Sequence, residues 1–459
     1  MSRILVCGVA PLPGENTLRS DAPGVRTWQF AWGLSRGGHE VHLVALKTPG
    51  AYLGDRGASR EERDGVTVER VEGGRPCIDL LRRRLAVAAP DAVVGAGISG
   101  SYALASCRPR VPLWADQHGH LMAEAQARAA RDGSNAVLPR YWRLVRPVMA
   151  WADKVSVVSA RQRYAAIGEL GAIGRLSAET CGYEFTAVVP CAVPPVAGVA
   201  DEGVGTTWRE GRVPADAFLV LWSGSYNTWS DAPTLFAGLE LAMRRDARIH
   251  FVSTGGAVPG QDDRTYPAFR QLVASSDLAS RFHLEGWIES RAARALWSEA
   301  DLGVLTEQPI YEGWLGSRNR VVQWVAAGLP VACTRTGDLG QTLADGDLAL
   351  SFAPGDPQQL ADRLVWAASH RENLRQLAER ARAWSARWSV EATTAELTRW
   401  AAAPSPSPDA ATRGRITSPL GHERAFVAAV HAAADLVPAL RRLGWARRRW
   451  RRGAAGPDA

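Results

Sequence analysis

The sequence predicts an α/β protein made of two doubly wound, Rossmann-like domains that face each other across a cleft. Short apolar runs typical of buried strands alternate with helical segments along most of the chain, a pattern typical of a parallel sheet covered by helices. The alternation lapses into Pro, Gly and Asp around 194–210 and then restarts, which indicates a hinge. The 459 residues, 46% of them hydrophobic, are enough for two separate cores.

The first domain is expected over 1–195. Its first strand is the apolar run ILVCGVA, a loop rich in Pro and Gly follows over 11–24, and VRTWQFAWGLSR predicts a helix that Gly37 and Gly38 end. Further buried strands are expected at EVHLVAL, PDAVVGAG, VPLWADQHG, DKVSVVSA and FTAVVPCAV.

The second domain is expected over 210–385. FLVLWSGS, RIHFVSTGG, FHLEGW, DLGVLTE and PVACT predict strands, and APTLFAGLELAMRR, ESRAARALWSEA and DPQQLADRLVWAAS predict helices between them. After it we expect a crossover helix over 386–403, and the composition of PSPSPDAAT predicts a linker over 404–412. The remainder, 413–459, is expected to be a basic tail, either amphipathic or disordered.

The formal net charge of +7 belongs to this tail, which holds ten arginines and three acidic residues, so the rest of the chain is neutral. A nucleic-acid-binding protein usually carries its basic surface on the folded domain, and we therefore expect no nucleic-acid partner. In the tail, apolar residues at helical spacing are followed by Trp445 and Trp450 among arginines. This mixture is expected at an anionic membrane surface; a soluble disordered tail is the alternative.

Cysteine spacing and hydropathy predict a cytoplasmic protein. The six cysteines are scattered without a CxxC pair, which fits reduced thiols better than disulfides or a zinc site. No run of 18 uninterrupted apolar residues occurs, and the opening residues do not have the pattern of a signal peptide. Through its tail the protein would lie peripherally on the inner face of the membrane.

The segment YEGWLGSRNRVVQWVAAGLPVACT, over 311–334, contains an electrostatic conflict. Val321, Val322, Trp324, Val325 and Leu329 form the apolar face of a helix, which Gly328 and Pro330 end. Arg318 and Arg320 lie at the start of this helix, where its dipole disfavours cations. A binding site for an anion would resolve the conflict.

These residues resemble a GT-B glycosyltransferase of the retaining, family-4-like kind (glycosyltransferases group 1). The resemblance covers roughly 3–403 as an ordered series: the opening strand with its Pro/Gly loop, GGHEVH, ADKVSVVSA, LVLWSGSYNTWSD, FHLEGWIES, ADLGVLTE, AAGLPVACT and GDLALSFAPGDPQQLADRL. No single motif is specific, but their order and spacing together imply the GT-B fold and a nucleotide-sugar donor.

The resemblance implies that the donor diphosphate rests on the start of the helix at Arg320. Gly316 would allow close approach, Ser317 would cap the helix, and the amides of Arg318 and Asn319 would face the phosphates. The family's two glutamates, eight residues apart, fall here on Leu315 and Gln323. Gln323 can still bind a ribose, and either Glu307 or Glu312 would replace the first glutamate in a catalytic role; the sequence does not choose between them.

The resemblance also implies contacts elsewhere in the cleft. His118, just beyond a strand end, would touch the donor sugar as a catalytic residue, with a loop histidine as the alternative. The remaining donor-binding candidates are Gly24 and Arg26 at the start of the first helix, Gly224 in WSGS, and Trp287 and Ile288 in EGWIE. We expect no metal and no cofactor, since Asp116, His118 and His120 lack further ligands and Asp262 and Asp263 are interpreted as a solvated loop.

The expected activity is retaining, metal-independent transfer of a hexosyl group from a nucleotide-diphosphate sugar to an acceptor hydroxyl, in synthesis of a cell-surface polysaccharide or glycolipid. The acceptor would be a glycan or a lipid-linked sugar. Leu315 and Gln323 motivate one alternative, a non-catalytic nucleotide-sugar-binding protein. A sugar-nucleotide epimerase of the same fold is another alternative, which needs acidic and basic groups in the cleft.

Overall fold

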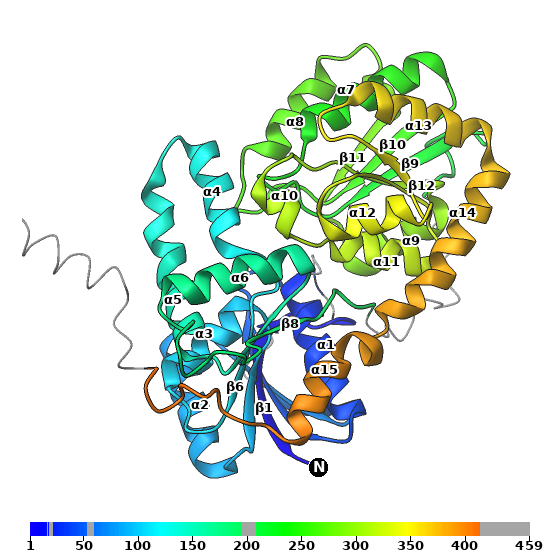
Figure 1. Ribbon diagram of the computed structural model, residues 1–459. Helices are drawn as coiled ribbons and strands as arrows, with labels where there is room; N and C mark the ends of the chain where they lie inside the picture. The colour runs from blue at the N-terminus through cyan, green and yellow to red at the C-terminus, as the bar shows by residue number, and fades with distance from the viewer. Residues whose placement is uncertain (16, 18–21, 53–58, 194–207, 414–459) are drawn as a thin grey trace, which may run out of the picture.

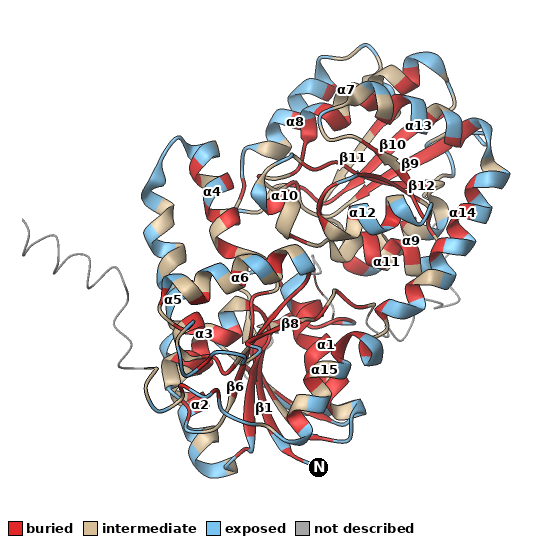
Figure 2. Ribbon diagram, in the orientation of Figure 1, coloured by how far each residue is buried: buried red, intermediate tan, exposed pale blue. Residues whose placement is uncertain are grey.

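The computed structural model describes residues 1–15, 17, 22–52, 59–193 and 208–413, which form two α/β units joined by a long helical return (Figure 1). Most strand residues are buried in both units, and the outward faces of the helices are exposed (Figure 2). The tail expected over 413–459 lies outside the described residues except for Arg413.

The first unit is built on an eight-stranded sheet with the order β3-β4-β2-β1-β5-β6-β7-β8. Every described pairing in it is parallel except that of β3 with β4. Its strands are β1 (Arg3–Ala10), β2 (Glu40–Lys47), β3 (Arg60–Arg63), β4 (Val66–Val71), β5 (Ala92–Gly95), β6 (Leu113–Asp116), β7 (Lys154–Val157) and β8 (Thr186–Val188). The central strands read as continuous apolar runs because both faces of the sheet are covered by helices.

The helices of the first unit are α1 (Ala22–Arg36), α2 (Arg75–Ala88), α3 (Gly97–Cys107), α4 (Leu121–Asp132), α5 (Leu138–Trp151) and α6 (Ala160–Ala172). Helix α3 packs against α2 and α5 on one side of the sheet, and α1 lies on the other side (Figure 1). A 3-10 turn at Asn135–Val137 joins α4 to α5, and α4 projects toward the second unit.

The second unit has a six-stranded parallel sheet with the order β11-β10-β9-β12-β13-β14. Its strands are β9 (Phe218–Ser223), β10 (Ile249–Thr254), β11 (Phe282–Gly286), β12 (Leu302–Leu305), β13 (Val331–Thr334) and β14 (Leu350–Phe352). Its helices are α7 (Ala232–Arg245), α8 (Thr265–Ala274), α9 (Ser290–Glu299), α10 (Tyr311–Leu315), α11 (Asn319–Ala327), α12 (Gly337–Asp345), α13 (Pro357–Ser369) and α14 (Arg371–Trp384), with a 3-10 turn at Ala279–Arg281. All the strands and helices that the sequence predicts for this unit are present, whereas α8, α10, α12 and β14 were not expected.

The chain then returns to the first unit. Helix α14 is followed by a 3-10 turn (Ser385–Trp388) and by α15 (Val390–Ala402), so the expected crossover helix over 386–403 is interrupted near its start. Helix α15 packs on α1, and Trp400 contacts the fully buried Trp114, with ring centroids 5.3 Å apart. The last helix of the described chain therefore completes the core of the first unit.

The segment expected to be a linker, 404–412, packs against the first unit. Ser407 and Asp409 are buried, and Asp409 pairs with the buried Arg175, with its Oδ1 2.9 Å from Nη2. Asp153 accepts a hydrogen bond from the Ser407 amide at 2.8 Å and one from Arg413 at 2.7 Å. The Pro- and Ser-rich composition is therefore misleading, because these small polar residues satisfy buried charges of the first unit.

The two sheets present the carboxyl ends of their strands to each other. Ligands of open α/β sheets bind at these ends, so the topology places a site between the units. None of the described helices is long and apolar enough to cross a membrane.

Candidate functional site

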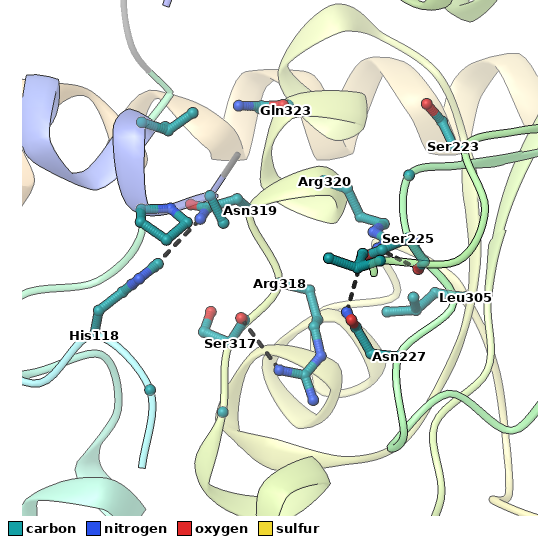
Figure 3. Close-up of a pocket in the computed structure, with 18 of the residues that line it drawn as sticks. His118, Ser223, Ser225, Asn227, Leu305, Ser317, Arg318, Asn319, Arg320 and Gln323 are labelled. Atoms are coloured by element: carbon teal, nitrogen blue, oxygen red, sulfur yellow. Dashed lines mark hydrogen bonds between the residues drawn. The ribbon is translucent and has the colours of Figure 1, made fainter. Parts of the chain in front are cut away.

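A cavity of about 800 Å³ lies between the two units. From the first unit it is lined by residues after β1, β5 and β6, and from the second by the ends of β9, β10 and β12, by helix α9 and by the start of α11. Figure 3 shows part of this lining, with His118 on one wall and α11 with its two arginines on the other. All predicted site residues except Gly24 and Arg26 line this cavity.

Helix α11 begins at Asn319, and the residue before it, Arg318, is the N-cap. The Arg318 side chain makes no capping hydrogen bond, and Ser317, which was expected to cap the helix, lies one residue too early. The first amides of a helix have no acceptor within the helix, so the start of α11 presents N–H groups and a positive dipole end to the cavity. Gly328, with φ 83°, ends the helix as predicted.

Arg320 is a half-buried cation, and one of its donor atoms is buried without a partner among the described residues. Its Nη2 donates a hydrogen bond to the carbonyl of Ser225 at 3.1 Å, and its guanidinium carbon lies 4.9 Å from the centre of the Trp222 ring. Nη1 is buried and has no hydrogen-bond partner among the described residues. Burial, and next the charge of Arg318, lower the pKa of Arg320 to about 10, so it is still protonated at neutral pH. A half-buried cation with a buried free donor is costly unless an anion binds there.

Arg318 differs, because its charge is already neutralised. Its Nη1 and Nη2 donate to the two carboxylate oxygens of Glu312 at 3.1 and 2.6 Å, and its Nε donates to Glu307. Burial alone would lower the pKa of Arg318, but Glu307 and Glu312 raise it above its usual value. Its guanidinium is therefore not free to bind a phosphate, and the predicted phosphate contact of this residue is the one through its backbone amide.

Glu307 and Glu312 hold Arg318 from two directions. Glu307 follows β12 and also accepts a hydrogen bond from Thr336 at 2.7 Å, whereas Glu312 belongs to α10. Burial raises the pKa of Glu312, and the ion pair with Arg318 opposes the shift and favours the charged form. Both carboxylates line the cavity, while Leu315 lines a second, more open cavity beside α4. The structure thus brings both candidate glutamates to the site and turns the residue at the family's first glutamate position away from it.

Two glycines close the second unit's wall beside Arg320. Gly224 has φ 109°, and a Cβ added to it would lie 3.2 Å from Nη2 of Arg320. Gly255, after β10, has φ 98°, and its Cβ would lie 2.2 Å from the carbonyl oxygen of Gly224. The two loops can lie this close to each other and to the guanidinium of Arg320 only because Gly224 and Gly255 lack side chains. Gly316 plays a similar part, since its Cβ would lie 2.5 Å from Nη1 of Arg318.

His118 lies opposite the start of α11. Its backbone is left-handed, with φ 59°, and its Nε2 is 3.3 Å from Nδ2 of Asn319, so the contact joins the two units. Burial, and next the charge of Arg26, lower the pKa of His118 to about 4. The imidazole is therefore neutral at physiological pH, as a hydrogen-bonding group for a sugar hydroxyl would be.

Trp287, Ile288 and Gln323 line the cavity toward α9. The indole N–H of Trp287 donates to the carbonyl of Ala257 at 2.8 Å, which fixes the ring against the loop after β10. Gln323 lies on α11 one turn beyond Asn319 and is half-buried (Figure 3).

Gly24 and Arg26 are not among the described lining residues, although Pro23 and Val25 beside them are; the burial of Arg26 corrects its assignment as a donor-binding residue. Arg26 is 1% exposed and forms a two-pronged ion pair with the fully buried Asp116, with distances of 2.7 and 3.0 Å. It also donates to Gln29 and to the carbonyl of Pro190. At Gly24 an added Cβ would lie 1.8 Å from the carbonyl oxygen of Pro11. Both residues fasten α1 to the sheet, and the sequence could not show the partner 90 residues away.

Other residues of the site were missed. Ser225, Asn227 and Thr254 line the second unit's wall, and Glu124 lines the first unit's wall from the first turn of α4. Their place at the end of a strand or within four residues after it was the available signal for the first three. For Glu124 the signal was its place four residues after WADQHGH.

Asp262 is buried, which corrects its interpretation as solvated. It accepts hydrogen bonds from Thr228 and Thr265 and lies 3.4 Å from Arg131 of α4. Within the described part of the chain, no three His, Cys, Asp or Glu residues are grouped as a metal site.

Comparison with protein families divides the chain in the same way. Residues 24–174 match the model of glycosyltransferase family 4, and residues 217–370 match the model of glycosyl transferases group 1. No curated protein sequence matches the chain significantly.

Solved structures show the same two-domain fold at low sequence identity. Sucrose-phosphate synthase from Thermosynechococcus elongatus superposes with a TM-score of 0.63 at 18% identity, covering 87% of this chain and 98% of that one. HepE from Anabaena in complex with UDP-glucose has a TM-score of 0.60 at 14% identity, covering 87% and 99%. An α,α-trehalose-phosphate synthase from Burkholderia xenovorans in complex with glucose-6-phosphate has 0.63 at 15%, covering 87% and 100%. With the two family models over the two units that form the cleft, the chain belongs to the GT-B glycosyltransferases, with a family-4 first domain and a group-1 second domain.

Proposed function

We propose that this glycosyltransferase moves a hexosyl group from a nucleotide-diphosphate sugar to an acceptor hydroxyl, with retention of configuration and without a metal ion. The observation that carries the proposal is the half-buried guanidinium of Arg320, whose buried Nη1 has no partner among the described residues and which lies between the Gly224 loop and the amides that begin α11. An anionic diphosphate bound beside the Gly224 loop would accept hydrogen bonds from both the guanidinium and the helix amides. HepE, of the same fold, has been solved with UDP-glucose and thus supports a donor of this class.

The donor would lie along the second unit's wall. Its base would lie at Trp287 and Ile288, its ribose at Gln323, and its diphosphate at the start of α11. The sugar would then extend toward His118, whose neutral imidazole can donate or accept one hydrogen bond. Glu307 and Glu312 would act through Arg318, whose position they fix, and would help to shape the sugar pocket.

Transfer requires one bond to break and one to form at the anomeric carbon. The bond to the diphosphate oxygen breaks, the acceptor oxygen bonds to the same carbon, and the leaving phosphate takes the proton of the acceptor hydroxyl. Negative charge grows on the diphosphate in the transition state, where helix amides and Arg320 are already oriented to stabilise it. This preorganisation can supply the electrostatic stabilisation without a metal.

Calorimetry and nucleotide release test the proposal. UDP, GDP, dTDP and their sugars are titrated into the full chain; one nucleotide should bind, and at 100 times its Kd it should stabilise the fold by about 2.7 kcal/mol. Its sugar should release free nucleotide when an acceptor is added. Binding without release under every acceptor would favour the non-catalytic alternative, and absence of binding would contradict both.

The epimerase alternative has a distinct outcome in the same experiment, namely conversion of the donor sugar without release of nucleotide. Such an enzyme needs groups free to move protons in the cleft. Glu307 and Glu312 are both engaged by Arg318, which leaves Glu124 as the one unengaged carboxylate in the described lining. The geometry therefore favours transfer over epimerisation.

We also propose that the arginine-rich segment 414–459, outside the described residues, holds the enzyme against an anionic membrane that carries its acceptor. Each cation near such a surface contributes about 1 kcal/mol. The test compares the full chain with a chain ending at Arg413 in sedimentation with anionic liposomes. If both remain in the supernatant at low salt, this part of the proposal is wrong.

A further inference from the structure

The two walls of the cleft differ in charge. Among its described residues, the first unit's wall is apolar or neutral, with Val25, Ile98 and Leu121 beside the polar Thr48 and Ser99. Its single charged lining residue within the described chain is Glu124. The cations of the lining, Arg294, Arg318 and Arg320, all belong to the second unit. The donor takes the second unit's wall in the proposed function, so the first unit's wall is left for the acceptor.

On the first wall, one amide at the start of α3 and one at the start of α4 already have acceptors within the protein. The Gly97 amide, which begins α3, donates to the Asp116 carboxylate at 2.9 Å. At the start of α4, the Ala123 amide donates to Nδ1 of His120 at 3.1 Å. The nearby guanidinium of Arg26 is paired with Asp116 behind the wall. These donors are thus already used within the protein.

Glu124 is a carboxylate of the first unit's wall that has no partner among the described residues and is available to a ligand. Its Oε1 lies near the backbone beside His118, since a Cβ added to Gly119 would be 2.6 Å from it. The carboxylate has no hydrogen bond or ion pair with any described residue, although it is close enough to Arg318 and Glu312 to affect titration. Burial raises the pKa of Glu124 to about 7, with Arg318 opposing this shift. The carboxylate oxygens of this half-buried residue are accessible from the cavity, so hydroxyl groups of a bound sugar can donate hydrogen bonds to them.

We propose that Glu124 binds the acceptor by accepting a hydrogen bond from an acceptor hydroxyl, and that the acceptor is an uncharged sugar or glycoside whose bound end carries neither phosphate nor carboxylate. The apolar neighbours Ile98 and Leu121 would contact its non-polar face. This inference rests on the proposed transfer reaction and on the place of the donor. It separates the protein from its structural neighbour in complex with glucose-6-phosphate, since no described cation of the first wall is free to bind a phosphate.

The experiment compares matched acceptors with the full chain and the donor that calorimetry identifies. Glucose is paired with glucose 6-phosphate, mannose with mannose 6-phosphate, and octyl glucoside is added as an apolar glycoside. Nucleotide release should be stimulated at least tenfold more by each neutral sugar than by its phosphate, with octyl glucoside the best of the set. Equal or greater stimulation by the phosphates overturns the inference, and so does stimulation by none of the five.

Two variants test the assigned residue. Glu124→Gln keeps the shape and removes the charge; the KM for the best neutral acceptor should rise about tenfold or more while the donor Kd stays unchanged. The preference over the phosphorylated partner should shrink. Glu169→Gln is the matched control: Glu169 is also in the first unit and burial also raises its pKa to about 7, but it bonds Gln117 and does not line the cavity.

The variants also distinguish failure of this inference from failure of the proposed function. An unchanged acceptor KM in Glu124→Gln would assign this glutamate a merely structural role at the start of α4 and overturn the inference. Donor binding and transfer to a phosphorylated acceptor would overturn it too, while the proposed function would stand. If no nucleotide binds at all, both the inference and the proposed function are wrong.

Discussion

A cation at the positive end of a helix costs free energy unless a counter-charge is near. Arg318 and Arg320, at the start of α11, differ in what lies near them. Arg318 has its counter-charges within the protein, in Glu307 and Glu312. The guanidinium of Arg320 contacts the carbonyl of Ser225 and the ring of Trp222, and its buried Nη1 has no partner in the described chain. The difference between the two arginines defines where an external anion is needed.

Removal of the Arg320 side chain should therefore weaken donor binding without unfolding the protein. Arg320→Ala should lower affinity for the nucleotide sugar by about 1.5–3 kcal/mol, the usual contribution of a charge-assisted hydrogen bond. Its thermal stability should be equal or higher, because a charge with a buried, unsatisfied donor is lost. Calorimetry beside Arg270→Ala, an exposed arginine of α8, checks this, and equal donor affinity in both variants would disprove the assignment.

Gln323 offers a gain-of-function test. Gln323→Glu should leave donor affinity unchanged or improve it, because a carboxylate accepts a stronger hydrogen bond from a ribose hydroxyl than an amide does. The comparison variant is Gln341→Glu on the exposed surface of α12, which changes the net charge equally. A large loss of affinity in Gln323→Glu alone would show that the ribose lies elsewhere.

Part of the residue-level site could be predicted from the sequence and part could not. The conflict between two arginines and a helix dipole is local, so the sequence could single out the start of α11, which the structure places at the cavity; the anion site there stays a prediction. Which arginine is free depends on Glu307 and Glu312, which reach Arg318 through the turn of the chain between β12 and α10. Arg26 of α1 was assigned to the donor through the resemblance, and the sequence could not show that it pairs with Asp116 at the end of β6.

At the scale of elements, the loops after β9 and β10 support the proposed phosphate site through close backbone packing. Gly224→Ala would place a methyl group 3.2 Å from Nη2 of Arg320 and would force a left-handed residue, with φ 109°. Gly211→Ala has a comparable backbone problem, with φ 70°, but no atom within 4 Å. Both variants should lose about 1–2 kcal/mol of stability.

Only Gly224→Ala should also weaken nucleotide binding, because only there does the new methyl group displace the guanidinium. Chemical denaturation measures the first effect and calorimetry the second. If the two alanine variants bind the nucleotide equally well, the Gly224 loop does not position Arg320 for the donor.

Element boundaries followed the sequence wherever capping is local. Gly328 ended α11 as its position after the apolar face predicted. The start of the same helix differed, because the helix begins after Arg318, which is held in place by its ion pairs, and not after Ser317. Buried Asp262 is a similar case, since its neighbours in sequence are polar but its partners come from α4 and the loop after β9.

At the scale of the whole molecule, alternation of strands and helices was sufficient to predict two doubly wound units. The central strands of such a sheet are buried on both faces, so the pattern is strong and repeats. The return of the chain was harder to predict. A segment rich in Pro and Ser resembles a linker by composition, yet 404–413 supplies partners for Arg175 and Asp153, which are both buried in the first unit.

This packing gives a prediction about truncation. A chain that ends at Arg413 should keep the melting temperature of the full chain, because all described contacts are present. A chain that ends at Ala403 leaves Arg175 without Asp409, and Asp153 without Ser407 and Arg413. Removing one partner of a buried ion pair costs about 3–5 kcal/mol. For a domain of this size the melting temperature should therefore fall on the order of 10 °C.

A point variant separates loss of this ion pair from loss of chain length. In the full chain, Asp409→Asn keeps the size of the side chain and removes its charge, so the buried guanidinium of Arg175 loses its counter-ion. The melting temperature of this variant should fall by most of the amount expected on truncation at Ala403. Calorimetric melting of the four proteins decides the matter: if the Ala403 chain melts with the full chain, segment 404–413 is a linker after all. If the Ala403 chain melts lower but Asp409→Asn melts with the full chain, the charge of Asp409 does not stabilise the fold. The stability lost on truncation then comes from the contacts of Asp153 with Ser407 and Arg413.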